Sequence, residues 1–156
     1  MARELAYDEH GNLLIDVRGP RFGAAITMTV VAVALVIQGG IGQVLVAWQW
    51  LAFAVAAFGG LERSLYGNLF RFVKRRFDLG PSPATEPEAP PRFSQLVGFL
   101  MASAALVSFA AGADIVGWVF TGLILAASSL LALTGFCVGC EMYLLGKRLT
   151  ARGAAS

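Results

Sequence analysis

Charged residues are scarce in this sequence. Only 14% of its 156 residues are Asp, Glu, Lys or Arg, against roughly 25% in soluble domains. No charged residue lies between Gly23 and Leu61, and Asp114 is the only one between Ser94 and Cys140. A membrane-spanning helix needs about 20 mostly apolar residues, so each stretch is long enough for two spans. The scarcity of charge therefore excludes an ordinary soluble domain.

Motifs typical of several enzyme and transporter classes are also missing. The sequence has no nucleotide-binding loop, no HExxH motif, no Gly-x-Ser-x-Gly elbow and no candidates for a catalytic triad. The predicted spans contain no acidic or basic residue that could drive an ion-coupled pump. The acidic start (Glu4, Asp8, Glu9 and Asp16) does not match a secretory signal. We expect one membrane domain, inserted directly and kept whole, with no cofactor, no metal and no nucleic-acid partner.

The expected fold class is all-α integral membrane, with four transmembrane helices arranged as two parallel helical hairpins. The spans are predicted at residues 22–37, 44–61, 93–111 and 116–136. Glycine-rich turns at 39–42 and 111–114 join each pair. The expected segments are a cytoplasmic N-terminal segment (1–18), the first hairpin with a basic amphipathic tail (19–80), a Pro-rich linker (81–90), the second hairpin with the cysteines (91–149) and a disordered tail (150–156).

Three segments outside the spans have recognisable patterns. LAYDEHGNLLIDV predicts a small β-hairpin against the membrane surface, turning at residues 9–12, because Gly and Asn accept positive φ at low cost. LGPSPATEPEAPP holds five of the six prolines, which predicts an extended or mobile linker. In ERSLYGNLFRFVKRRF, basic and apolar residues alternate, which favours an amphipathic segment on anionic headgroups. A plain stop-transfer tail is the alternative for that segment.

The positive charges predict the orientation in the bilayer. All twelve Lys and Arg lie in the N-terminal segment, the central connection or the C-terminal tail, and none lies in the two short turns. Lys and Arg are enriched in cytoplasmic loops of membrane proteins. We therefore expect a multi-pass protein with both termini and the central connection in the cytoplasm.

An internal repeat is visible at a 71-residue offset. Pro20-Arg21-Phe22 opens the first hairpin and Pro91-Arg92-Phe93 opens the second, while Ala34-Leu35-Val36 matches residues 105–107. Pro fits the first turn of a helix, and Arg can reach the headgroups while Phe enters the hydrocarbon edge. The repeat predicts two equivalent helical hairpins.

The only two cysteines, Cys137 and Cys140, lie three positions apart in GFCVGCEMYLLGKR. Positions i and i+3 of a helix share a face, so the two sulfurs can approach and form a disulfide after a local turn. Cys-x-x-Cys is also the spacing of many dithiol redox centres. We therefore predict Cys137 and Cys140 as the catalytic residues, in a resting reduced state if they face the cytoplasm.

Two other roles for the cysteines stay open at this point. They can be free thiols that pack as small apolar residues. They can also bind zinc, which needs four ligands, if Glu141 and the only histidine, His10, join them or if two protomers pool their thiolates. The simplest interpretation of Glu141 is an interfacial charge exposed to water.

The segments VRGPRFGAAIT, RSLYGNLFRFV, PPRFSQLVGF and GFCVGCEMYLLGKRL, in this order, resemble the bacterial membrane family called domain of unknown function 4395. The resemblance runs from about Asp16 to Leu149. It implies four spans, the cysteine pair Cys137 and Cys140, and a place in the bacterial inner (plasma) membrane. Genes of the family often lie beside, or fused to, thioredoxin-like or sulfur-transfer proteins, so the resemblance also implies thiol or sulfur chemistry.

The leading functional hypothesis is a thiol redox or sulfur-transfer protein with a thioredoxin-like or sulfurtransferase partner. Cys137 would attack and Cys140 would resolve, by analogy with other Cys-x-x-Cys centres, while Arg21 and Arg92 position the helix starts. Quinone-coupled disulfide enzymes have a similar size, but they usually need more than one cysteine pair, so a quinone is unsupported. The alternatives are an accessory subunit of a larger membrane complex, a homo-oligomer, and a small dimeric pore or carrier.

Overall fold

The computed structural model describes residues 7–11 and 13–154. Four of its helices are long and apolar enough to cross a membrane. The chain is thus an all-α integral membrane protein with four transmembrane helices, as predicted. In chain order the elements are β1 (Leu14–Asp16), α1 (Arg18–Ile37), α2 (Gly39–Gly59), α3 (Leu65–Arg76), β2 (Thr85–Pro87), α4 (Ala89–Ala110), α5 (Asp114–Thr134) and α6 (Val138–Ala154).

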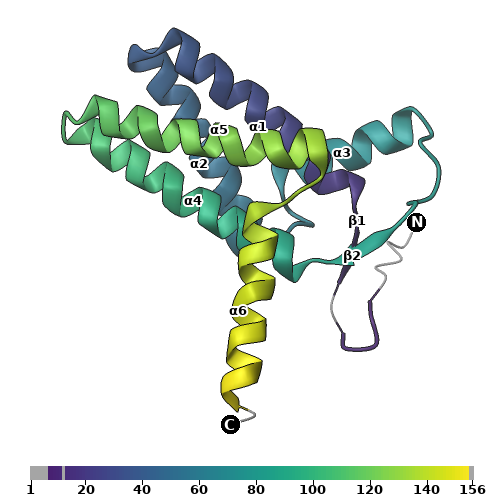
Figure 1. Ribbon diagram of the computed structural model, residues 1–156. Helices are drawn as coiled ribbons and strands as arrows, with labels where there is room; N and C mark the ends of the chain where they lie inside the picture. Colours follow the sequence, from purple (N-terminus) through teal and green to yellow (C-terminus); the bar gives the residue numbers. More distant parts are fainter. Residues whose placement is uncertain (1–6, 12, 155–156) are drawn as a thin grey trace.

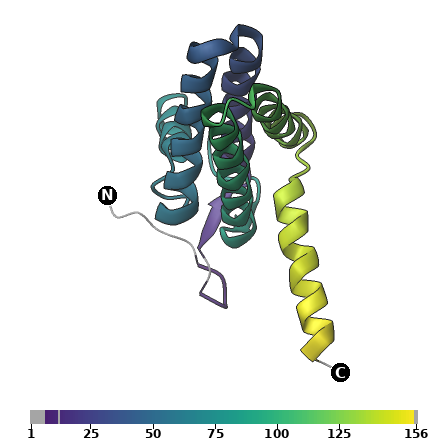
Figure 2. The same ribbon diagram turned by 90° about the vertical axis from the view of Figure 1, so that its left-hand side faces the viewer.

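The two hairpins, α1–α2 and α4–α5, lie with both tight turns at one end of the bundle (Figure 1). The strands, α3 and α6 all lie at the other end (Figure 1), and the second view shows α6 extending away from the bundle (Figure 2). The first helix of each hairpin packs most extensively on the second helix of the other, α1 on α5 and α4 on α2. The hairpins therefore interlock, and the two ends of the described chain emerge on the same side of the spanning helices.

The core confirms that the two hairpins are equivalent. Ala34 and Ala105, which share the 71-residue offset, are both 0% exposed and lie in one cluster. Val31 and Ala102 share the same offset, and both are buried in the neighbouring cluster. Matching positions of the repeat thus meet at the centre of the bundle, where small side chains let the helices approach closely.

The repeated arginines hold the ends of helices. The Arg92 guanidinium donates to the carbonyls of Ala57 (2.8 Å) and Phe58 (3.4 Å) at the end of α2. Arg21 donates in the same way to Ala132 O, 3.4 Å away, near the end of α5. The C-terminal end of a helix carries partial negative charge, so both contacts are favourable. Each arginine thus fastens the start of one hairpin to the end of the other.

The N-terminal strand pairs differently from the prediction. The predicted hairpin is present as a single β-bridge, Tyr7 to Leu13, around a turn in which Gly11 N–H donates to Asp8 O at 3.0 Å. The longer pairing joins β1 to β2 of the Pro-rich linker, antiparallel, with Ile15 opposite Glu86. The linker is extended as predicted at 85–87, and this extended backbone supplies β1 with a partner from a distant part of the chain. Residues 1–6 and 12 of the expected hairpin lie outside the described residues.

The helix boundaries differ from the hydropathy pattern by about one turn. α1 and α4 begin at Arg18 and Ala89, each four residues before the predicted span, because their first turns are helical but polar. The amphipathic segment at 65–76 is helical, with Ser64 as its N-cap. α6 continues to Ala154, so residues 150–154 are helical although we expected a disordered tail. Its repeated basic and apolar residues can sustain a surface helix.

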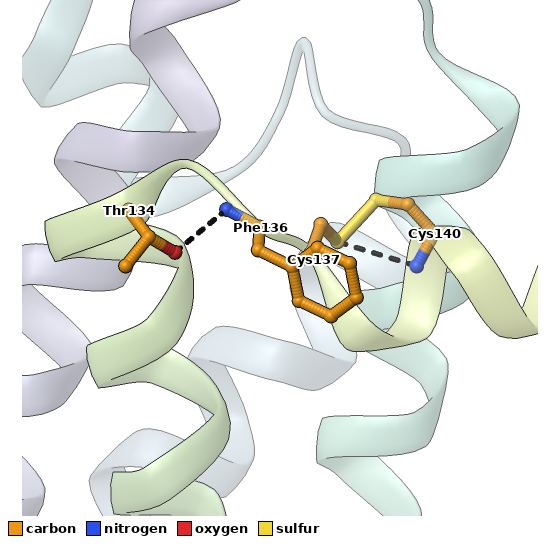
Figure 3. Close-up of a disulfide and its surroundings, with 4 residues drawn as sticks. All are labelled: Thr134, Phe136, Cys137 and Cys140. Atoms are coloured by element: carbon orange, nitrogen blue, oxygen red, sulfur yellow. Dashed lines mark hydrogen bonds between the residues drawn. A yellow bond between two sulfur atoms is a disulfide. The ribbon is translucent and has the colours of Figure 1, made fainter.

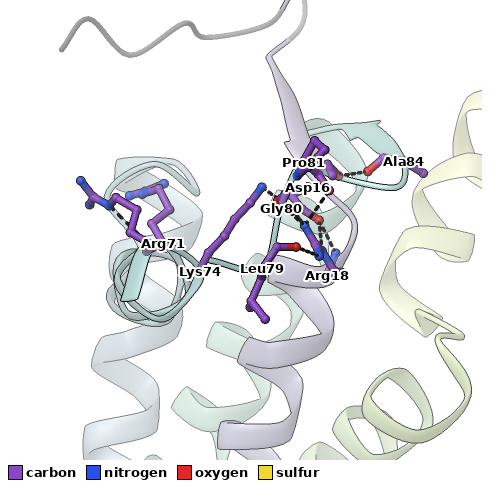
Figure 4. Close-up of polar contacts among 10 residues, drawn as sticks. Asp16, Arg18, Arg71, Lys74, Leu79, Gly80, Pro81 and Ala84 are labelled. Atoms are coloured by element: carbon purple, nitrogen blue, oxygen red, sulfur yellow. Dashed lines mark hydrogen bonds and ion pairs between the residues drawn. The ribbon is translucent and has the colours of Figure 1, made fainter. Parts of the chain in front are cut away.

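A charge cluster joins β1, α1, α3 and the linker (Figure 4). Asp16 Oδ2 lies 2.9 Å from Arg18 Nη2 and 2.8 Å from Lys74 Nζ. Burial alone would raise the pKa of Asp16, but the hydrogen bonds from Arg18 and Lys74 outweigh it and hold that pKa well below its usual range. Arg18 also donates to linker carbonyls at 79–81. The cluster therefore holds β1, α1, α3 and the linker together at the polar end of the bundle.

Candidate thiol site

The cysteine segment begins where α5 stops. Gly135 has φ 78°, the left-handed conformation that ends many helices, and its N–H donates to Leu131 O at 3.0 Å. The next N–H, of Phe136, donates to the Thr134 hydroxyl at 3.2 Å (Figure 3). The fourth span was predicted to end at residue 136, close to this point. The structure has a clear break, after which α6 begins at Val138.

The two cysteines form a disulfide with their Cα atoms 5.2 Å apart. Cys137 directly precedes α6, and its sulfur accepts the N–H of Cys140 at 3.2 Å (Figure 3). Ser64 plays the same part before α3, where its hydroxyl accepts the N–H of Gly67 at 3.1 Å. Cys137 is thus a sulfur N-cap, held at the positive end of a helix.

Gly139, between the cysteines, lets α6 press against α4. A Cβ atom on Gly139 would lie 2.7 Å from the Cα, Cβ and Oγ atoms of Ser94. The ring of Tyr143, one turn further along α6, packs on Phe93 with centroids 5.7 Å apart. These contacts fix the start of α6, and with it the disulfide, against the first turns of α4.

A cavity of about 460 Å³ lies between the helices beside the disulfide. Cys137 belongs to its wall, and Cys140 does not. Both cysteines are half-buried. Most of the wall is apolar and comes from all six helices, from β1 and from the Cys137 segment, with Phe53, Met101 and Ile124 deep between the spans. One of the two cysteines therefore lines a partly open, mostly apolar cavity.

The cavity wall also contains polar side chains. The Tyr66 hydroxyl donates to Gln49 Oε1 at 2.9 Å, and Gln49 Nε2 donates to the Thr27 hydroxyl at 3.1 Å. Burial raises the pKa of Tyr66 above its ordinary value. Ser94 and Gln95 line the cavity near Cys137. Tyr66 and Thr27 line it as well, so the apolar space has hydrogen-bonding groups on several helices.

The structure brings together some of the candidate residues and not others. The Arg21 guanidinium lies beside the cysteine segment, with its Cζ atom 3.7 Å from where a Cβ on Gly135 would be. Arg92 holds the end of α2 instead. Within residues 7–11 and 13–154, no three His, Cys, Asp or Glu side chains group around a point that could hold a metal ion. The zinc alternative with Glu141 and His10 is therefore not formed by these residues of one chain.

Residues 15–148 match the model of the family described as "Domain of unknown function (DUF4395)". The chain belongs to this family. No curated protein and no solved structure matches the chain. Membership in the DUF4395 family covers the four spans and the cysteine segment, but it assigns no activity.

Sequence reasoning missed the cavity and its polar groups. Gln49 and Gln95 carry the available signal, because carboxamides inside long apolar segments are costly unless they have a partner or a function. Gln49 is 1% exposed and uses both ends of its amide. Gln95 lines the cavity, whereas Gln49 bonds to Thr27 and Tyr66, which line it. That these groups gather around one space depends on the packing of the two hairpins against each other, which periodicity along one helix does not reveal.

Proposed function

We propose that this protein is a membrane-embedded thiol redox protein whose Cys137–Cys140 pair exchanges electrons with a thioredoxin-like partner. The observation that carries the proposal is the sulfur N-cap: Cys137 Sγ accepts the N–H of Cys140 at 3.2 Å at the start of α6. A helix N-terminus lowers the pKa of a cysteine thiol and so favours the nucleophilic thiolate.

The exchange begins when the Cys137 thiolate attacks a disulfide in the partner. A mixed disulfide forms, and the second sulfur of the partner leaves as a thiolate. Cys140 then loses its proton and attacks Cys137 Sγ, which forms the Cys137–Cys140 disulfide and releases the partner as a dithiol. Two electrons pass to the partner. The same steps in reverse oxidise the partner, and the mixed disulfide involves Cys137 in both directions.

The proposal includes a location in the bacterial inner membrane with both termini in the cytoplasm. The distribution of the twelve Lys and Arg supports this orientation. It brings α6 and the cysteine pair to the cytoplasmic face, where a soluble thioredoxin-like domain can reach them. Cys137 and Cys140 are half-buried and adjoin the half-exposed Phe136, which gives that partner an apolar contact point.

A trapping experiment tests the roles of the two cysteines. Purified Cys140→Ser protein is mixed with a thioredoxin that keeps only its attacking cysteine, activated as a mixed disulfide with thionitrobenzoate. Cys137 should displace the thionitrobenzoate and accumulate a mixed disulfide with the thioredoxin, because neither protein has a resolving thiol. Cys137→Ser is the matched control, and it should lose more than about 90% of the trapped species, since its remaining thiol lacks the helix N-cap. Non-reducing electrophoresis and mass spectrometry measure the adduct. Equal trapping by both variants would contradict the assignment.

The accessory-subunit alternative has less support from the packing. Gly42 and Gly117, small residues that could admit a helix of another protein, make close contacts within the chain instead. A Cβ on Gly42 would lie 2.7 Å from Ala34 O, and one on Gly117 would strike the ring of Phe109. Gly122 faces open space, but a single glycine does not define an interface.

A further inference from the structure

We propose that the cavity beside Cys137 binds a membrane quinone, which oxidises the reduced Cys137–Cys140 pair. This inference rests on the proposed redox function and adds its electron acceptor. Three observations carry it: the size and composition of the cavity, the hydrogen-bond donors in its wall, and the presence of one reacting sulfur in the same wall.

The cavity suits an apolar ring with a hydrocarbon tail. Its volume of about 460 Å³ lies within the roughly 300–1,000 Å³ of small-molecule sites. Gly19 and Pro20 line it at the beginning of α1, and Thr27 lines it two turns further along that helix. On α4 the wall extends from Pro91 to Met101. The space therefore runs from the level of the cysteines into the apolar middle of the bundle.

Hydrogen-bond donors in the wall match quinone carbonyls. The side chains of Ser94 and Gln95 make no hydrogen bond with the described part of the chain, although both line the cavity. The Thr27 hydroxyl accepts from Gln49, and its own proton has no acceptor among the described residues. An acyl chain offers these donors no acceptor, whereas a quinone offers two carbonyl oxygens.

The chemistry balances with a quinone as the only co-reactant. Two S–H bonds of the reduced pair break and one S–S bond forms between Cys137 and Cys140. The two electrons and two protons pass to the quinone, whose carbonyl oxygens become the hydroxyls of a quinol. Cys137 is the sulfur that faces the ring because it lines the cavity and Cys140 does not. Electrons would then flow from the thioredoxin-like partner to the quinone pool.

A single cysteine pair is sufficient to transfer electrons from a protein partner to a quinone in this arrangement. The sequence suggested that one pair argues against a quinone, because related chemistry usually uses a second pair to relay electrons. Here the half-buried Cys137 adjoins the apolar cavity and is still partly open to solvent. The same disulfide can therefore meet a protein partner on one side and a quinone on the other.

The test uses the full chain in phosphatidylcholine vesicles under anaerobic conditions, with the pair reduced beforehand. A short-chain quinone is added, quinol is followed by absorbance, and the disulfide is counted by alkylation. We expect one quinol for each disulfide formed. Ala127→Phe should abolish quinol formation because Ala127 lines the cavity. The neighbouring Ala126→Phe is the matched control, since Ala126 is exposed and lies outside the cavity wall.

A second variant keeps the volume of the site nearly unchanged. Gln95→Leu should raise the quinone concentration for half-maximal rate about three- to tenfold, the effect of one lost hydrogen bond. This variant tests quinone binding even if Ala127→Phe fails to fold.

The outcomes separate this inference from the proposed function. Normal exchange with thioredoxin and no reaction with quinone would overturn the quinone site and leave the redox function standing. Equal quinone reduction by the wild type and a folded Ala127→Phe variant would overturn the cavity as the site. A tightly held lipid that quinone does not displace would also overturn it. Failure of both exchange and quinone reduction would contradict the redox function itself.

Discussion

At the residue scale, the site depends on the Cys137 cap of α6 and on the close approach of Gly139 to Ser94. Cys137 does for α6 what Ser64 does for α3, with sulfur in place of a hydroxyl oxygen. Gly139 then lets the first turn of α6 reach the backbone of Ser94. The spacing Cys-x-x-Cys predicted that the sulfurs could meet. It did not predict that one sulfur caps the helix, because that depends on the break at Gly135.

Gly139→Ala should displace the start of α6, because the new Cβ would lie 2.7 Å from the Cα, Cβ and Oγ atoms of Ser94 on α4. Overpacking of this kind costs about 1–3 kcal/mol in free energy of unfolding. The matched control is Gly146→Ala, further along α6, where a new Cβ meets nothing within 4 Å. Its effect should be neutral or stabilising, by up to about 1 kcal/mol. Thermal unfolding in detergent measures both, and similar loss in the two variants would contradict the close approach.

At the scale of elements, the polar end of the bundle depends on contacts between segments that are distant in the sequence. Hydropathy predicted the four spans, and alternation predicted the amphipathic α3, because both signals are local. The pairing of β1 with β2 and the bonds from Asp16 to Lys74 join residues more than fifty positions apart. No local pattern marks such partners, so the sequence predicted only a hairpin within residues 1–18.

Asp16→Asn should destabilise the protein in a pH-dependent way. The pKa of Asp16 is lowered in the folded state, so its stabilisation is present above its unfolded pKa of about 3.9. It is lost as pH falls through the folded value. We expect a loss of about 1–3 kcal/mol at pH 7 from hydrogen bonds to a charged group. The difference from the wild type should shrink as pH falls below about 4.

Thermal unfolding at pH 7 and pH 3 measures this difference. Asp78→Asn is the control, since Asp78 is exposed and its positive φ of 46° suits Asn. Its stability should follow that of the wild type at both pH values. A destabilisation by Asp16→Asn that is the same at pH 7 and pH 3 would show that the charge of Asp16 is not its cause.

At the scale of the whole molecule, two equivalent hairpins interlock and leave a cavity beside the thiol pair. The repeat at a 71-residue offset predicted the equivalence of the hairpins. It did not predict the exchange of partners, in which Arg21 and Arg92 each hold a helix of the other hairpin. The cavity forms because helices of the two hairpins pack on each other. No single segment of the sequence therefore predicts it.

The orientation of the molecule can be tested by cysteine labelling in cells. In a chain without Cys137 and Cys140, Ala111→Cys at a short turn should react with a membrane-impermeant maleimide on intact cells. Gly146→Cys on α6 should react only after permeabilisation. Both positions are exposed, so access depends on the side of the membrane. Labelling of α6 in intact cells would reverse the proposed orientation.

The central claim is that Cys137 and Cys140 form a working redox pair, and its most direct test is a redox titration in native membranes. Alkylation against defined dithiol buffers counts the thiols at each potential. We predict a reversible disulfide with a potential of about −180 to −270 mV, the range of thioredoxin-like and isomerase centres. Two thiols that never pair at any potential would contradict the account.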